Sequence, residues 1–135
     1  MNLQPPIRDV NLTVSKALPA AAATNYSNAI DLGDQAPGIK LDDWQIEVAV
    51  PALASLADAK TYIATLQDSA DGVTFADVPS LNPITRLGAG GVGAAAKTQL
   101  YPVPKDLNRY IRVKSVVLAA GGDNTASSVT LSMVR

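Results

Sequence analysis

The sequence predicts an all-β protein, an antiparallel β-sandwich whose leading architecture is a jelly roll of about eight strands. Two observations predict this class. Short segments alternate apolar and polar residues with the period of two that is typical of half-buried strands, and Gly, Pro, Asn and Asp residues separate these segments. An immunoglobulin-like sandwich fits less well, because the connections are unevenly long and the Cys-Trp-Cys framework of antibody domains is missing.

The first third of the chain is predicted to hold an arm and three strands. Residues 1–9 contain Pro5 and Pro6 and no apolar periodicity, which favours an extended N-terminal arm. Alternating segments follow, and Trp44 is the largest side chain that we expect in the core. These three predicted strands are residues 10–15, 26–32 and 44–50.

The middle of the chain is predicted to add four short strands and one long connection. Pro79, Pro83 and the glycine-rich run 88–96 interrupt the alternation, and such a long irregular segment in a small domain usually carries function or contacts. The predicted strands here are residues 61–67, 73–78, 84–87 and 97–101.

The last two predicted strands are residues 109–118 and 127–134, joined by a turn-forming Gly-Gly-Asp-Asn sequence. In the segment RYIRVKSVVL, Ile111 and Val113 fall on the face that we expect to enter the core, opposite residues such as Trp44 and Ile46 from the other sheet. Residues 10–135 are therefore expected to form a single jelly-roll domain behind the arm.

Composition excludes several classes of function. The net charge is −1, without the basic stripe of nucleic-acid-binding proteins. Cys and His are absent, which removes thiolate nucleophiles and the commonest general base. No apolar run is long enough to span a membrane and no secretory signal is visible, so we expect a soluble protein made inside a cell. With 22 alanines and few aromatic residues the core is thin, which suggests stabilisation by assembly.

Two motifs resemble ligand sites but are better interpreted as loops. Gly88, Gly90 and Gly93, with Gly91 among them, match the G-x-G-x-x-G dinucleotide pattern, but the βαβ frame that this site needs is missing. The carboxylates of DSADGVTFAD do not have the spacing of a calcium loop, and a turn at Asp71 explains them more simply. We therefore predict no catalytic, cofactor or metal residues, and an enzyme would need an unfamiliar arrangement.

Arg112 and Lys114 lie on the outward side of the strand at 109–118. Such charges usually keep the face of a sheet soluble, and they are also candidates for contact with an acidic partner.

The phrases AIDLG, LQDSADGVTF and LNRYIRV resemble the jelly-roll capsid cement, or decoration, proteins of tailed bacteriophages of the Bordetella-phage type, over roughly residues 27–134. The resemblance implies a non-enzymatic virion protein, made in the host cytoplasm. It would bind the exterior of an icosahedral head across neighbouring major capsid proteins, as a homo-oligomer with a dimer favoured over a trimer.

Given this resemblance, we expect capsid or intersubunit contacts at the arm and the glycine-rich loop. The contact residues are Pro5, Pro6, Ile7, Arg8, Gly88, Gly90, Gly91, Gly93, Arg112 and Lys114. No nucleic acid, membrane or cofactor is expected. The alternative is a receptor- or carbohydrate-binding jelly roll of a phage tail, although such modules typically expose aromatic platforms and this chain has only six aromatic residues, four Tyr, one Trp and one Phe.

Overall fold

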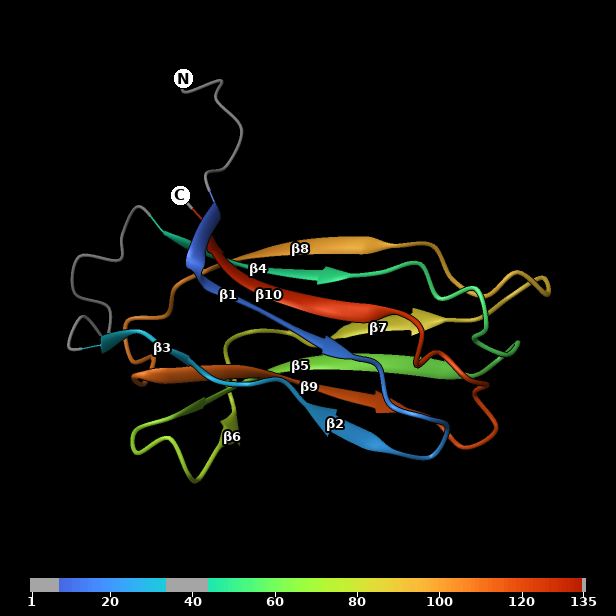
Figure 1. The fold of residues 1–135 in the computed structure, drawn as a ribbon, viewed down its shortest axis with the longest axis horizontal. Helices are drawn as coiled ribbons and strands as arrows, with labels where there is room; N and C mark the ends of the chain where they lie inside the picture. Colours follow the sequence, from blue (N-terminus) through green and yellow to red (C-terminus); the bar gives the residue numbers. More distant parts are fainter. Residues whose placement is uncertain (1–7, 34–43, 135) are drawn as a thin grey trace, which may run out of the picture.

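The computed structural model describes residues 8–33 and 44–134, which form two antiparallel sheets packed face to face (Figure 1). The prediction of an all-β sandwich is confirmed. The strands of the described residues are β1 (Arg8–Ala17), β2 (Thr24–Tyr26), β3 (Ile30–Asp31), β4 (Gln45–Val50), β5 (Thr61–Ser69), β6 (Ala76–Asp77), β7 (Ile84–Leu87), β8 (Lys97–Pro102), β9 (Tyr110–Val117) and β10 (Ser128–Val134).

The strand order is that of a jelly roll. One sheet has the order β1-β10-β4-β8, and the other has the order β2-β9-β5-β6, with β3 also paired to β9 and β7 also paired to β5. If β2 and β3 are counted as one interrupted strand, and β6 and β7 as another, eight strands run 1-8-3-6 in one sheet and 2-7-4-5 in the other. This double Greek key is the predicted architecture.

The single strand predicted at residues 26–32 is interrupted at Ser27, where a side-chain hydrogen bond takes the place of one backbone hydrogen bond to β9. Its backbone N–H donates to the carbonyl of Val113 at 3.0 Å, while its Oγ accepts the N–H of Val113, also at 3.0 Å. A side-chain oxygen therefore stands where a backbone carbonyl would continue the pairing, and β2 and β3 form on either side of it.

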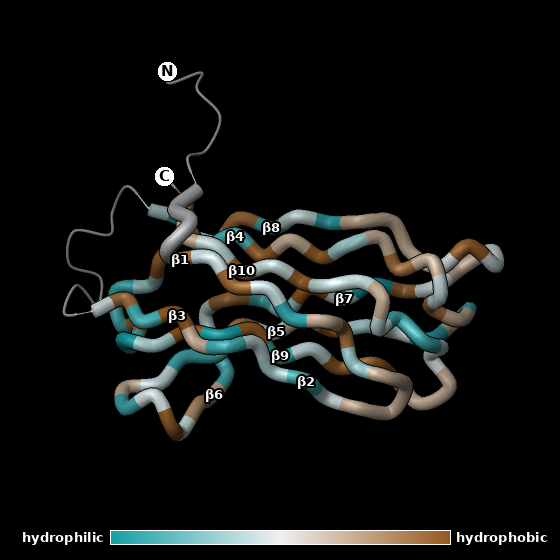
Figure 2. The backbone as a smooth tube through the Cα atoms, in the orientation of Figure 1, coloured by the Kyte–Doolittle hydropathy of each residue, from teal (hydrophilic) through white to brown (hydrophobic). Residues whose placement is uncertain are grey.

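The core lies between the sheets and confirms the predicted faces of β9. Burial alternates strictly along β9, with Ile111 and Val113 inward, and Ile46 from the other sheet belongs to the same apolar cluster. Apolar and polar segments alternate along the strands in Figure 2. Trp44, however, lies just before β4 and is only partly buried, so the prediction that it is the largest core residue is wrong; that residue is Tyr62.

Tyr62 brings a polar group into this core and pairs it. Its hydroxyl lies 2.7 Å from Oγ of Ser115, and both residues are buried, at 0% and 1% exposure. Burial disfavours the phenolate and raises the pKa of Tyr62 to about 12, although the hydrogen bond with Ser115 acts in the opposite direction. The pair joins β5 to β9, the two central strands of the second sheet.

Candidate functional site

The connections between strands gather at the two ends of the long axis. The β4–β5, β7–β8 and β9–β10 connections lie at one end, and the β5–β6 and β8–β9 connections lie at the other (Figure 1). A jelly roll produces this arrangement because successive strands run in opposite directions. Contacts made by these loops are therefore directed to two separate places.

The glycine-rich loop between β7 and β8 is fastened at its base. Leu53 and Ala94 exchange two backbone hydrogen bonds, of 2.8 and 3.1 Å, and the N–H of Gly91 donates to Oδ1 of Asp58 at 2.9 Å. The run leads directly into strand β8, so the interpretation of the G-x-G-x-x-G match as a loop is confirmed.

The four predicted contact glycines of this loop have different surroundings. Gly88 and Gly93 are buried against the backbone of the β4–β5 connection, whereas Gly90 and Gly91 are exposed at the tip. Val92 follows them with 76% of its surface exposed. The loop therefore has an exposed apolar tip on a fixed base, and Gly88 and Gly93 belong to the base.

The β5–β6 loop at the other end is also fastened by hydrogen bonds and also exposes an apolar side chain at its tip. Oδ1 of Asp71 accepts the N–H groups of Val73 and Thr74, both at 2.9 Å, and the hydroxyl of Ser69 at 2.8 Å. The bonds from Thr74, Val73 and Ser69, in that order, lower the pKa of Asp71 to about 2. The predicted turn is confirmed. The strand predicted at residues 73–78 is limited to β6, because the backbone N–H groups of Val73 and Thr74 donate to Asp71 and are not available for pairing with a neighbouring strand. Val73 at the tip is 82% exposed.

Arg112 is held on the outer face of the second sheet by neighbouring side chains. Its guanidinium carbon lies 4.1 Å from the ring centre of Tyr26 and 4.0 Å from that of Phe75, and its Nε donates to Oε1 of Gln67 at 2.9 Å. A guanidinium between two rings is a favourable cation–π arrangement. Arg112 therefore holds the side chains of Tyr26, Phe75 and Gln67 together on this face of the sheet.

Lys114 lies on the same outer face and is also engaged. Its Nζ forms a 3.2 Å ion pair with Asp77, whose pKa is lowered chiefly by the hydrogen bond from Gln67. Because Gln67 also accepts from Arg112, the two predicted contact residues belong to one polar network across β9, β5 and β6.

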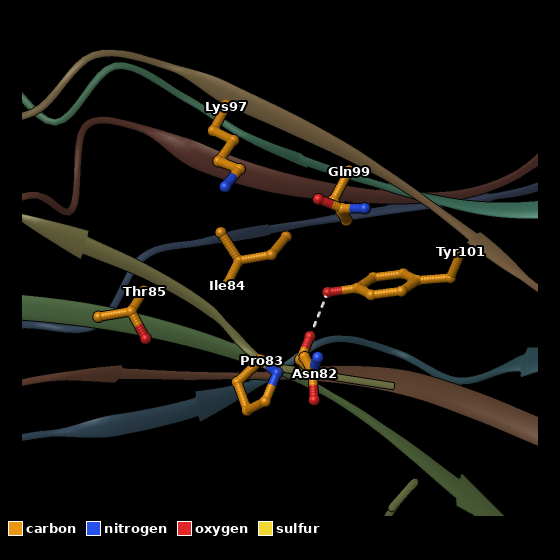
Figure 3. A pocket seen from close by; sticks show the side chains of 7 residues that line it. All are labelled: Asn82, Pro83, Ile84, Thr85, Lys97, Gln99 and Tyr101. Atoms are coloured by element: carbon orange, nitrogen blue, oxygen red, sulfur yellow. Dashed lines mark hydrogen bonds between the residues drawn. The ribbon is translucent and has the colours of Figure 1, made fainter. Parts of the chain in front are cut away.

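A polar cleft of about 250 Å³ separates the free edges of β7 and β8. Lys97, Gln99 and Tyr101 alternate along β8 and point into it, toward Ile84 of β7 (Figure 3). The hydroxyl of Tyr101 donates to the carbonyl of Asn82 at 2.5 Å and closes one end. Positions that face the other sheet are normally apolar, so Lys97 and Gln99 make the open edge of the sandwich polar.

The predicted arm is mostly outside the described residues. Pro5, Pro6 and Ile7 fall there, whereas the backbone of Arg8 pairs with Val134 at the start of β1. The last two residues of the predicted arm, 8 and 9, therefore belong to a strand.

Sequence reasoning missed the support of Gly91 by Asp58, the stacking of Arg112 and the cleft at Lys97. These arrangements join residues far apart in the chain, as in the bond between Arg112 and Gln67, 45 positions apart, so no local pattern signals them. The one available signal was the spacing of Lys97, Gln99 and Tyr101, which places two polar residues on the same face of the strand as the buried tyrosine.

Within residues 8–33 and 44–134, no three His, Cys, Asp or Glu side chains come together as a metal site requires. No helix in this part of the chain is long and apolar enough to cross a membrane.

Comparison with known proteins places the chain in a family. No curated protein is significantly similar to it. The Bbp16 family profile, in contrast, matches residues 12–133, from the first strand to the last. Because this match covers both sheets and nearly the whole chain, the protein belongs to the Bbp16 family, a family of Bordetella phage proteins.

Proposed function

We propose that this protein is a non-enzymatic capsid cement protein that binds the outer surface of an icosahedral phage head and bridges neighbouring major capsid proteins. It acts as a symmetric homo-oligomer, with a dimer favoured, and stabilises the head mechanically. Membership of a phage protein family supports a role in a phage, and the absence of His and Cys supports a role other than catalysis.

Two exposed apolar side chains, one at each end of the sandwich, support this proposal. The two most exposed large apolar side chains of the described residues, Val73 and Val92, sit on fastened loops at opposite ends of the sandwich (Figure 1). An exposed apolar residue on a rigid support loses little conformational entropy when a partner covers it. A protein that joins two neighbours needs contact surfaces of this kind at two separate places.

The state of the aromatic residues favours the head over a sugar-binding role on the tail. Tyr62 and Tyr101 are buried, and Tyr26 and Phe75 are stacked on Arg112. Few ring faces are left for stacking on a carbohydrate.

The test is binding of the purified protein to phage heads that lack it, followed by heating of the heads. Wild type should bind and raise the temperature at which the heads break. Val73→Asp and Val92→Asp should each weaken binding, whereas Ser80→Asp, at an exposed turn between β6 and β7, should not. Electron cryo-microscopy of the virion that places the protein on the tail alone would overturn the proposal.

A further inference from the structure

The cleft between β7 and β8 has the chemistry of a site for an acidic group. Its lining residues are Asn82, Pro83, Ile84, Thr85, Lys97, Gln99 and Tyr101, which include one cation and no carboxylate. The side chain of Lys97 forms no ion pair or hydrogen bond with any residue of the described ranges, in contrast to that of Lys114, which is paired with Asp77. A carboxylate in the cleft would be opposed by no like charge among the lining side chains.

The walls of the cleft are edge strands, which favour a ligand that is an extended peptide chain. Within the described sheets, β8 pairs only with β4, and β7 pairs only with β5. Each strand therefore has one side whose backbone N–H and C=O groups lack a neighbouring strand, and these two sides border the cleft. Backbone groups at a free edge pair with an added peptide strand.

A free sugar acid would satisfy the charge but not the rest of the site. The ring of Tyr101 is buried and its hydroxyl is engaged with Asn82, so the cleft offers no aromatic face for a sugar to stack on. Amide and hydroxyl groups from Gln99, Thr85 and Asn82 suit a peptide backbone, which presents both donors and acceptors.

From the charge, the free edges and the polar lining together, we propose that the β7–β8 cleft receives an extended segment of the partner protein, and that an acidic side chain of this segment pairs with Lys97. The inference rests on the proposed function, because it takes the partner to be the capsid protein, and it deepens that function by naming the chemistry of the contact.

The test is quantitative binding to undecorated heads over a range of salt concentrations. Lys97→Met, which keeps much of the length and removes the charge, should weaken binding roughly tenfold and reduce its salt dependence. Lys97→Arg should bind nearly as wild type. Lys105→Met, at an exposed lysine in the β8–β9 connection, is the matched control and should leave binding unchanged.

A second variant tests the cleft without changing Lys97. Thr85→Arg places a large side chain at an exposed position of the opposite wall, and it should weaken binding at least as much as Lys97→Met while melting like wild type.

The possible failures are distinct. If wild type binds heads and both Lys97→Met and Thr85→Arg bind equally well, the cleft assignment is wrong and the cement function stands. If wild type does not bind heads, both proposals fall. Competition by free glucuronate as effective as that by a glutamate-containing peptide would overturn the assignment to a peptide segment.

Discussion

Replacing Tyr62 with Phe should destabilise the protein even though the aromatic ring remains. The Tyr62 hydroxyl is 2.7 Å from Oγ of Ser115, and the Ser115 side chain is buried. Phe at position 62 leaves that serine hydroxyl without its partner in the core. A buried polar group that loses its partner costs about 1–3 kcal/mol of the free energy of unfolding, and we expect a loss in this range.

The double variant gives the decisive measurement. Ser115→Ala should also cost about 1–3 kcal/mol, because it leaves the Tyr62 hydroxyl unpaired. Tyr62→Phe combined with Ser115→Ala removes both polar groups together and should cost less than either single change. Urea unfolding followed by the fluorescence of Trp44 measures all four proteins. A double variant whose loss equals the sum of the two single losses would show that the hydroxyls do not act as a pair.

The same residue predicts how stability changes at alkaline pH. Burial raises the pKa of Tyr62 to about 12 from its ordinary value of 10 in the unfolded chain. Above pH 10 the unfolded chain loses this proton while the folded protein keeps it, so stability falls as pH rises toward 12. The loss is roughly 2 kcal/mol at pH 12. Tyr62→Phe lacks this contribution, and its stability should fall less steeply over that window; parallel curves would contradict the assignment.

Two further predictions test the fold. Val113→Asp places a carboxylate on the inward face of β9, at a position only 1% exposed, and its desolvation costs several kcal/mol, so the variant should not fold; a soluble protein that melts cooperatively would mean that the faces of β9 are reversed. Gly93→Ala should lower the melting temperature far more than Gly90→Ala. Both glycines have positive φ, which costs about 1–2 kcal/mol for alanine, but only at Gly93 would the new Cβ meet backbone, 1.8 Å from the carbonyl oxygen of Leu53; equal shifts would contradict this close approach.

The sequence predicted the parts of the fold that depend on local alternation. The inward residues of β9 and the strands at β4 and β10 follow from a period of two, which is visible in a few residues. The break between β2 and β3 was not predictable in this way, because Ser27 accepts from an amide 86 positions away. Trp44 was misassigned for a related reason: its size favours burial, but its place just outside β4 leaves it partly exposed.

The candidate contact surfaces also combine features that a local sequence pattern predicts with features that depend on distant contacts. The glycine-rich loop was recognisable from its composition, and the turn at Asp71 from its Asp-Gly pair. Which glycines reach the tip, and that Arg112 is stacked between two rings, depend on elements brought together only by the complete sandwich.

The position of β10 has a consequence for how the chain is made. This strand lies between β1 and β4, and its residue Val134 pairs with Arg8 at the beginning of β1. During synthesis β1 and β4 therefore lack the strand that joins them until β10 has left the ribosome, and pairing between such distant segments is intrinsically slow. Fragments that end before β10 therefore cannot complete the sandwich.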